Sequence, residues 1–145
     1  MSTLNYGVME KIFQVSELMT ADPVTIGLEN SLSDASNLFK SRKIRHLPVV
    51  SDGKLVGILS YTDILRISFG NAFDEQGDDG ILEMLGINQV MKHSPVTVAP
   101  EDSVKDAARI LAEKEFHALP VVEEDKLIGI ITTTDIINHF LSVCN

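Results

Sequence analysis

The stretches HLPVVSDGKLVGILSYTDIL (residues 46–65) and ALPVVEEDKLIGIITTTDII (residues 118–137) are two copies of one pattern, placed 72 positions apart. The same offset aligns residues 19–65 with residues 91–137 without a gap, and 19 of these 47 positions are identical. Such self-similarity indicates that one supersecondary unit occurs twice. Because so small a unit buries only a modest part of its surface alone, we expect the two copies to pack face to face.

Each copy predicts the element order β-α-β-β-α, and hence an α+β fold. A Pro-Val-Thr triplet opens a short first strand, and residues 31–44 and 103–116 carry apolar side chains at helical spacing. Two further strands follow in each copy: LPVV and KLVGILS in the first, and LPVV and KLIGIIT in the second. A hairpin turn joins each pair, at residues 51–54 and at residues 123–126. A final amphipathic helix closes each copy. Its apolar side consists of Ile64, Leu65 and Ile67 in the first copy, and of Ile136, Ile137 and Phe140 in the second.

The repeats divide the chain into four segments. Residues 15–69 form the first repeat, and residues 87–145 form the second. Between them, residues 70–86 hold four glycines and five acidic side chains, which predicts an exposed linker with one short helical piece, ILEML. Residues 1–14 have no counterpart in the second half, and we expect an N-terminal helix there, around Val8, Ile12 and Phe13.

Composition and charge argue against several classes of protein. The chain has 12 Lys and Arg against 21 Asp and Glu, a net charge of −9, and no basic cluster, so we expect no nucleic-acid partner. No apolar run approaches the roughly 20 residues of a membrane-spanning helix, and the first residues do not read as an export signal. The single cysteine, Cys144, cannot form a disulfide within the chain, which favours a reducing, cytoplasmic location.

Helix starts account for part of the repeated motif. Ser or Thr at an N-cap, with an acidic residue three positions later, is typical of a capping box. For the two pairs that begin at Ser31 and Ser103, we interpret the pattern as a helix cap alone. Four pairs in the chain fit the pattern: Ser31 and Asp34, Ser60 and Asp63, Ser103 and Asp106, and Thr132 and Asp135.

The junctions at residues 60–63 and 132–135 carry more than a cap requires. They follow the carboxyl end of a strand, where binding crevices form in α/β proteins, and they contain the extra hydroxyls of Thr62, Thr133 and Thr134. A helix N-terminus attracts phosphate, whereas an aspartate there would repel it unless the carboxylate binds something else. Because a carboxylate can accept hydrogen bonds from two adjacent ribose hydroxyls, we interpret the junctions as nucleotide sites. Capping alone remains the alternative.

Together, these features resemble a tandem pair of CBS domains, named for cystathionine β-synthase, over residues 15–142. The resemblance implies two β-α-β-β-α repeats packed through their sheets with pseudo-twofold symmetry. It also implies two clefts between the repeats that bind adenosine compounds, namely AMP, ADP, ATP or sometimes S-adenosylmethionine. Modules of this family commonly form dimers, so the resemblance implies a homodimer here.

The family signature G-h-x-(S/T)-x-(S/T)-D falls on both junctions. By resemblance, the two aspartates hold ribose and the hydroxyls hold phosphate. The signature residues are Gly57, Ser60, Thr62 and Asp63 in the first repeat, and Gly129, Thr132, Thr134 and Asp135 in the second.

The resemblance also implies which residues surround the adenine. Thr25 and Thr97 lie where the first strand of the family lines the adenine pocket. The base would be sandwiched by apolar neighbours, which are Val24, Ile26, Val96, Val98 and the pairs Leu47–Pro48 and Leu119–Pro120.

Basic residues often precede Leu-Pro-Val in this family. Here Arg45 and His46 occupy these positions in the first repeat, and His117 and Ala118 in the second. Arg45 could bind phosphate as a fork of donors, or it could be an exposed surface charge. The two histidines could contact a ligand or pack at an edge. Ala118 removes one polar group from the second site, which predicts two unequal sites.

Catalysis has no support in the sequence. We find no Ser-His-Asp arrangement, Gly-rich phosphate loop or metal-ligand spacing, and His93, His139 and Cys144 are scattered. We therefore expect no enzyme, no metal and no catalytic cofactor. The interpretation is a regulatory module that senses AMP, ADP or ATP in the clefts between its repeats and acts on a separate protein target through its dimer geometry. The alternatives are a structural interaction module with empty clefts, and a binder of S-adenosylmethionine.

Overall fold

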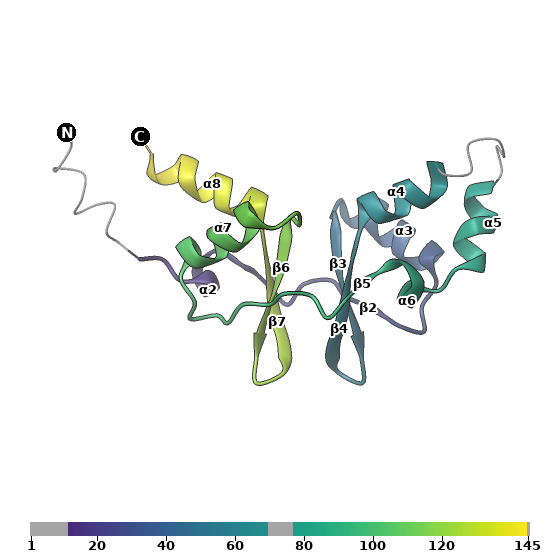
Figure 1. The fold of residues 1–145 in the computed structure, drawn as a ribbon, viewed down its shortest axis with the longest axis horizontal. Helices are drawn as coiled ribbons and strands as arrows, with labels where there is room; N and C mark the ends of the chain where they lie inside the picture. The colour runs from purple at the N-terminus through teal and green to yellow at the C-terminus, as the bar shows by residue number, and fades with distance from the viewer. Residues whose placement is uncertain (1–11, 70–76, 145) are drawn as a thin grey trace. The chain divides into compact units, whose positions relative to one another are not determined.

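The repeated motif forms two long antiparallel hairpins, as predicted (Figure 1). In the first copy, β3 (His46–Ser51) pairs with β4 (Lys54–Ser60), and in the second, β6 (Ala118–Glu123) pairs with β7 (Lys126–Thr132). The predicted turns join them with residues of positive φ, which a tight hairpin turn requires. These turn residues are Asp52 and Gly53 in the first copy, and Glu124 and Asp125 in the second.

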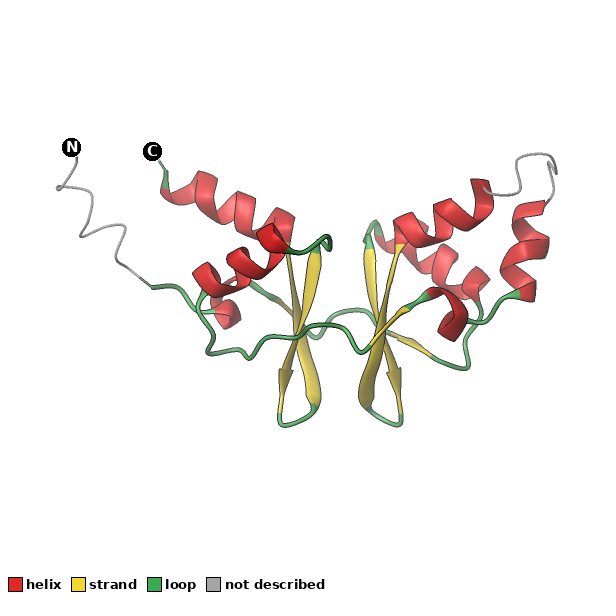
Figure 2. Ribbon diagram, viewed as in Figure 1, coloured by secondary structure: helices red, strands yellow, loops and turns green. Residues whose placement is uncertain are grey.

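The computed structural model describes residues 12–69 and 77–144, and the chain divides into two compact units. We call Pro23–Pro95, which contains the first hairpin, the N-repeat unit. The C-repeat unit consists of Met1–Asp22 with Val96–Asn145 and contains the second hairpin. Each unit is a mixed α+β structure with its helices beside its own sheet (Figure 2).

The opening segment of each sequence repeat belongs to the unit of the other repeat. The first repeat starts with α2 (Val15–Leu18) and β1 (Thr20–Ala21), but β1 pairs with β7 in the C-repeat unit. The second repeat starts with α6 (Ile87–Val90) and β5 (Lys92–His93), but β5 pairs with β4 in the N-repeat unit. The compact units are therefore offset from the repeats that the sequence defines.

The predicted first strand differs between the two units. In the N-repeat unit, β2 (Ile26–Gly27) lies just after the Pro-Val-Thr triplet and pairs with β3 in parallel. The ladder continues with a hydrogen bond of 3.2 Å from the Leu28 N–H to the Val50 carbonyl. In the C-repeat unit, Val98 forms only an isolated bridge. The residue that corresponds to Leu28 is Pro100, which has no N–H to extend the ladder.

The predicted helix starts are confirmed at α3 (Leu32–Arg42) and α7 (Val104–Glu113), which end a few residues earlier than expected. The Ser31 hydroxyl accepts from the Asp34 N–H at 3.0 Å, and the Asp34 carboxylate accepts from the Ser31 N–H at 3.0 Å. The bond from the Ser31 N–H, together with a longer bond of 3.4 Å from the Asn30 side-chain amide, holds the pKa of Asp34 below its ordinary value. Ser103 caps α7 in the same way, but its reciprocal bond is not formed.

The linker carries more structure than the sequence predicts. Residues 70–76 lie outside the described part of the chain, but α5 (Gly77–Met84) contacts α3 and α4 (Tyr61–Phe69). Leu82 of α5 is only 6 % exposed and belongs to the core of the N-repeat unit. The expectation of an exposed linker is therefore wrong for this half, because Leu82 and Leu85 of the ILEML piece pack on the core.

Each unit has its own apolar core. In both cores, the inward side chains of the hairpin pack against helices of the same repeat and against residues of the exchanged opening segment. The fully buried members are Leu32, Ala35, Leu47, Val49, Leu59 and Ile87 in the N-repeat unit, and Val15, Ala107, Leu119, Val121 and Ile131 in the C-repeat unit.

The last helix, α8 (Thr133–Val143), departs from its expected packing. Ile136 packs on the core, but Ile137 and Phe140 are 52 % and 58 % exposed. Most of the predicted N-terminal helix lies outside the described residues. Of its expected members, Ile12 is exposed and the Phe13 ring contacts the His139 ring edge-on, with the ring centroids 4.4 Å apart. Across residues 12–69 and 77–144, no helix has the length and apolarity needed to span a membrane.

Candidate functional site

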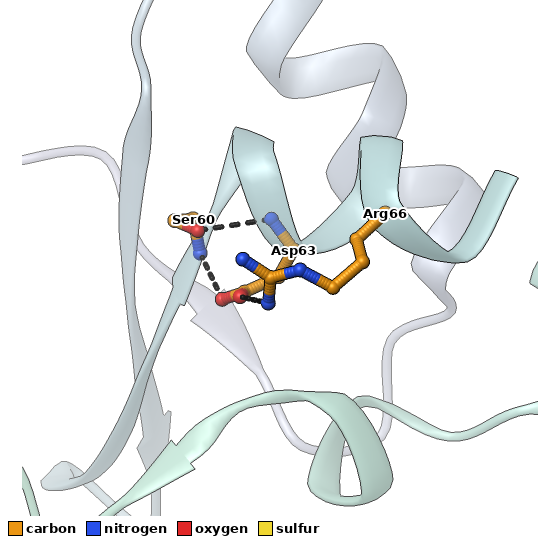
Figure 3. Close-up of polar contacts among 3 residues, drawn as sticks. All are labelled: Ser60, Asp63 and Arg66. Carbon is orange, nitrogen blue, oxygen red and sulfur yellow. Dashed lines mark hydrogen bonds and ion pairs between the residues drawn. The ribbon is translucent and has the colours of Figure 1, made fainter. Parts of the chain in front are cut away.

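Both junctions of the repeated motif are built as capping boxes. The Ser60 hydroxyl accepts from the Asp63 N–H at 3.0 Å, and Asp63 Oδ2 accepts from the Ser60 N–H at 3.1 Å (Figure 3). In the second copy, the corresponding bonds between Thr132 and Asp135 measure 3.1 and 2.9 Å. The predicted cap is confirmed in both, and it holds each carboxylate in a fixed position at the start of a helix through one of its two oxygens.

The three consecutive threonines have three different environments. Thr132 caps α8, and Thr133 donates from its hydroxyl to the His117 carbonyl at 3.3 Å. Thr134 is exposed, and its hydroxyl forms no hydrogen bond with any described residue. Thr62 is likewise exposed beside Asp63. Thr62 and Thr134 therefore each present an exposed hydroxyl beside the capped aspartate.

The hairpins bring the predicted basic positions to the same junctions. His46 lies opposite Ser60 in the β3–β4 pairing, and the Tyr61 N–H donates to the Arg45 carbonyl at 2.8 Å. Arg45 is exposed and His46 is half-buried. The exposure of Arg45 fits both of the roles that the sequence leaves open for it.

In the second copy, the same backbone arrangement presents different side chains. The Thr133 N–H donates to the His117 carbonyl at 2.9 Å, and Ala118 lies opposite Thr132. His117 is exposed, whereas Ala118 is buried. The position that holds half-buried His46 in the first repeat therefore offers no polar group in the second.

The residues predicted around the adenine separate into exposed and covered groups. Thr25 and Thr97 are exposed. Each lies one residue before a residue that pairs with the hairpin, Ile26 with Val49 and Val98 with Val121. Val24 is half-buried, and Val96 is 42 % exposed. The remaining predicted neighbours are all buried: Ile26, Leu47, Pro48, Val98, Leu119 and Pro120. In this structure, the Leu-Pro pairs support the strands and present little surface to a base.

All predicted site residues of one copy lie within one unit. Those from Thr25 to Asp63 belong to the N-repeat unit, and those from Thr97 to Asp135 belong to the C-repeat unit. Among residues 12–69 and 77–144, no three His, Cys, Asp or Glu side chains come together as they would to hold a metal ion.

Arg66 is a neighbour of the site that the sequence reasoning missed. Its Nη1 lies 3.3 Å from Oδ1 of Asp63, the carboxylate oxygen that the cap leaves free. Figure 3 shows the guanidinium against this oxygen. The available signal was the spacing, since Asp and Arg three positions apart on a helix face one another.

Comparisons with known sequences and with solved structures point to the same protein family. The CBS domain family matches this chain twice, at residues 15–70 and 87–142. A CBS domain-containing protein of Dictyostelium discoideum is 32 % identical over 134 residues, which cover 89 % of this chain and 92 % of that protein. The chain spans less than half of two longer relatives from Methanocaldococcus jannaschii, namely 46 % and 43 % of their lengths, at 30 % and 35 % identity.

Solved structures agree with these matches. The CBS-pair protein CBSX2 from Arabidopsis thaliana superposes with a TM-score of 0.80 and 31 % identity, covering 92 % of this chain and 97 % of that one. CBSX2 has also been solved in complex with AMP. A second CBS domain pair, solved with 5′-methylthioadenosine and S-adenosyl-L-methionine, has a TM-score of 0.78 at 25 % identity, covering 91 % of this chain and 98 % of that one.

Proposed function

The chain belongs to the CBS domain family as a tandem pair of domains, and from this we propose that it is a regulatory module that binds AMP, ADP or ATP. The observation that carries the proposal is the junction at Asp135. Its Oδ2 is held by the cap, while its Oδ1 accepts no hydrogen bond from a described residue. A carboxylate held in this way can accept from ribose hydroxyls without any rearrangement of the helix start.

The other groups at the junction suit the rest of a nucleotide. The Thr134 hydroxyl is exposed at the start of α8, where the Thr133 and Asp135 N–H groups already have acceptors, and a helix N-terminus favours a phosphate. Thr97 would line the adenine side. In the N-repeat unit, Thr62 and Arg45 would contact the phosphate beside Asp63, and Thr25 would line the adenine side. We propose no catalytic step and no metal for either site.

S-adenosylmethionine is the second candidate ligand, because one similar CBS domain pair was solved with it. It shares adenosine with AMP, so the ribose and adenine contacts would be common to both. It carries no phosphate, and its sulfonium is a cation. A helix N-terminus with exposed hydroxyls favours an anion over a cation, and this favours the nucleotide.

A thermal-unfolding screen tests this proposal. We expect one of AMP, ADP and ATP, but not GTP, to raise the unfolding temperature by roughly 5–10 °C at 100 times its dissociation constant, since such binding adds about 2.7 kcal/mol. Asp135→Ala should lower this rise and leave only the part that the site at Asp63 contributes. A larger rise with S-adenosylmethionine would instead favour the second candidate.

Asp34→Ala is the matched control for that screen. Asp34 occupies the same capping position in α3 that Asp135 occupies in α8, so both variants weaken a helix start. Only Asp135→Ala should lose part of the response to ligand. If Asp135→Ala responds to the nucleotide as fully as Asp34→Ala does, the junction is a cap and no more. The nucleotide would then bind elsewhere than at this junction. A wild-type protein that responds to no adenosine ligand would instead support the structural interaction module.

We further propose that the module forms a homodimer through α8 and acts on a separate protein target from the cytoplasm. The support is the apolar surface of α8, on which Ile137, Phe140, Leu141 and Val143 are 47–64 % exposed. A ligand could change the dimer geometry only through different affinities for two arrangements.

Sedimentation measures the oligomeric state directly. We expect a mass twice the 15.9 kDa of one chain, and a single-chain mass for Phe140→Asp, because a charge buried in an apolar contact is costly. Met84→Asp is the control, since Met84 is 78 % exposed on α5, a helix of the N-repeat unit. A wild-type protein that sediments as one chain at all concentrations would refute the dimer.

A further inference from the structure

The carboxylates of Asp63 and Asp135 occupy equivalent positions in the two repeats but have different neighbours. Asp63 is 8 % exposed, and Arg66 follows it by one helical turn. Asp135 is half-buried, and the position equivalent to Arg66 is Asn138. We propose that Arg66 sets the affinity of the N-repeat site, making it the weaker of the two, because it occupies the carboxylate oxygen that a ribose needs. This inference rests on the nucleotide-binding function proposed above.

The geometry leaves Asp63 little room for a further donor. Its Oδ2 accepts from the Ser60 N–H at 3.1 Å, and its Oδ1 is 3.3 Å from Nη1 of Arg66 (Figure 3). The Asp63 side chain is only 10 % exposed, so little of its carboxylate is open to a ligand. A ribose that binds there has to share Oδ1 with the guanidinium or displace it.

The C-repeat site lacks this competitor. Asn138 is exposed and carries no charge, and it forms no hydrogen bond with Asp135 in the described structure. Oδ1 of Asp135 therefore stays open to a ligand, while Oδ2 is held by the Thr132 N–H at 2.9 Å. The two sites share their cap but differ in the availability of the second oxygen.

Arg66 is placed to act on the ribose side of the site. The exposed hydroxyl of Thr62 precedes Asp63 at the start of α4, and phosphate is favoured at a helix N-terminus. Arg66 lies on the other side of Asp63, about 4.5 Å further along the helix axis. Its guanidinium contacts the carboxylate rather than the helix start. It is thus a competitor of the ribose and not a phosphate ligand.

The expected effect is modest, because the Arg66 side chain is 73 % exposed. Exposed ion pairs are worth about 0.2–1 kcal/mol, which corresponds to roughly a 1.5- to fivefold change in dissociation constant. Arg66 therefore weakens the N-repeat site without closing it. Since salt screens exposed pairs, the difference between the sites that comes from Arg66 should shrink as the ionic strength rises.

The test measures AMP binding by calorimetry with one site inactivated at a time. In the Asp135→Ala background, only the N-repeat site remains, and adding Arg66→Asn should tighten AMP binding by up to about fivefold at low salt. Arg66→Lys, which keeps the charge, should retain most of the weaker affinity. In the Asp63→Ala background, the reciprocal change Asn138→Arg should weaken AMP binding by a similar factor.

The outcomes separate this inference from the function on which it rests. If the wild-type protein binds neither AMP nor another adenosine ligand, the proposed function fails. If AMP binds but Arg66→Asn weakens binding to the N-repeat site, Arg66 is a phosphate ligand and the inference is overturned. An unchanged affinity, or an effect that does not depend on salt, overturns it as well. If the Asp135→Ala protein binds no AMP, Arg66→Asn must restore binding for the inference to hold.

Discussion

Replacing Ile87 with alanine is expected to destabilise the N-repeat unit by about 2–5 kcal/mol, the usual range when a buried isoleucine leaves a cavity. Ile87 is fully buried and belongs to the core that contains Leu32 and Leu59. It lies in the second sequence repeat but packs in the unit of the first. The substitution should therefore weaken the hairpin of residues 46–60, which lies almost 30 positions before it in the chain.

Native-state hydrogen exchange reads out the effect in each unit, because amides exchange through local or global opening. Amides of β3 and β4 should lose protection in Ile87→Ala, while those of β6 and β7 change less. The control is Met84→Ala on the adjacent helix α5, where the side chain is 78 % exposed and the expected change is within about 0.5 kcal/mol. Loss of protection concentrated in β6 and β7 would contradict the assignment of α6 to the N-repeat unit.

Local features of this fold could be predicted because each depends on a few neighbouring residues. The hairpin turns, the helix starts at Ser31 and Ser103, and the capping boxes at Asp63 and Asp135 all have short-range signals. The repeat strengthened them, since the same local signal occurs twice. The α+β class followed from the order of these elements.

The exchange of the opening segments has no local signal. The alignment shows that Met19 and Met91, like Gly57 and Gly129, are identical between the copies, but it does not say which methionine meets which glycine. In the structure, Met91 faces Gly57 of the other repeat. Pairing across repeats depends on how the chain connects in space, which a sequence read along its length does not contain.

Only part of the candidate site could be predicted from the sequence, because the rest depends on contacts in space. The capped carboxylates and exposed hydroxyls follow from residue type and position. The ion pair of Asp63 with Arg66 depends on side-chain geometry, and the burial of Pro48 and Pro120 depends on packing around the strands. The sequence therefore indicates which groups meet at a junction more reliably than how much of each group a ligand can reach.

Gly57→Val is expected to cost about 3 kcal/mol, near the upper end of the 1–3 kcal/mol typical of overpacked cores. Gly57 is a buried residue of β4, at the point where β5 and Met91 lie against the strand. A Cβ built on Gly57 would lie 2.8 Å from the Lys92 carbonyl oxygen and would also overlap the Met91 side chain. Met91 can move aside, but the carbonyl belongs to the paired backbone and cannot move without disturbing β5.

Chemical denaturation of Gly57→Val, together with Gly57→Ala and Met91→Ala in a double-mutant cycle, separates these two contacts. If the backbone contact dominates, Met91→Ala recovers little of the loss caused by Gly57→Ala. Gly80→Ala is the control, because Gly80 lies in α5 with no atom within 4 Å of an added Cβ. It should stabilise by about 0.5–1 kcal/mol through helix propensity. A Gly57→Val protein as stable as wild type would show that β5 does not pack on Gly57, and that the second repeat does not complete the sheet of the first.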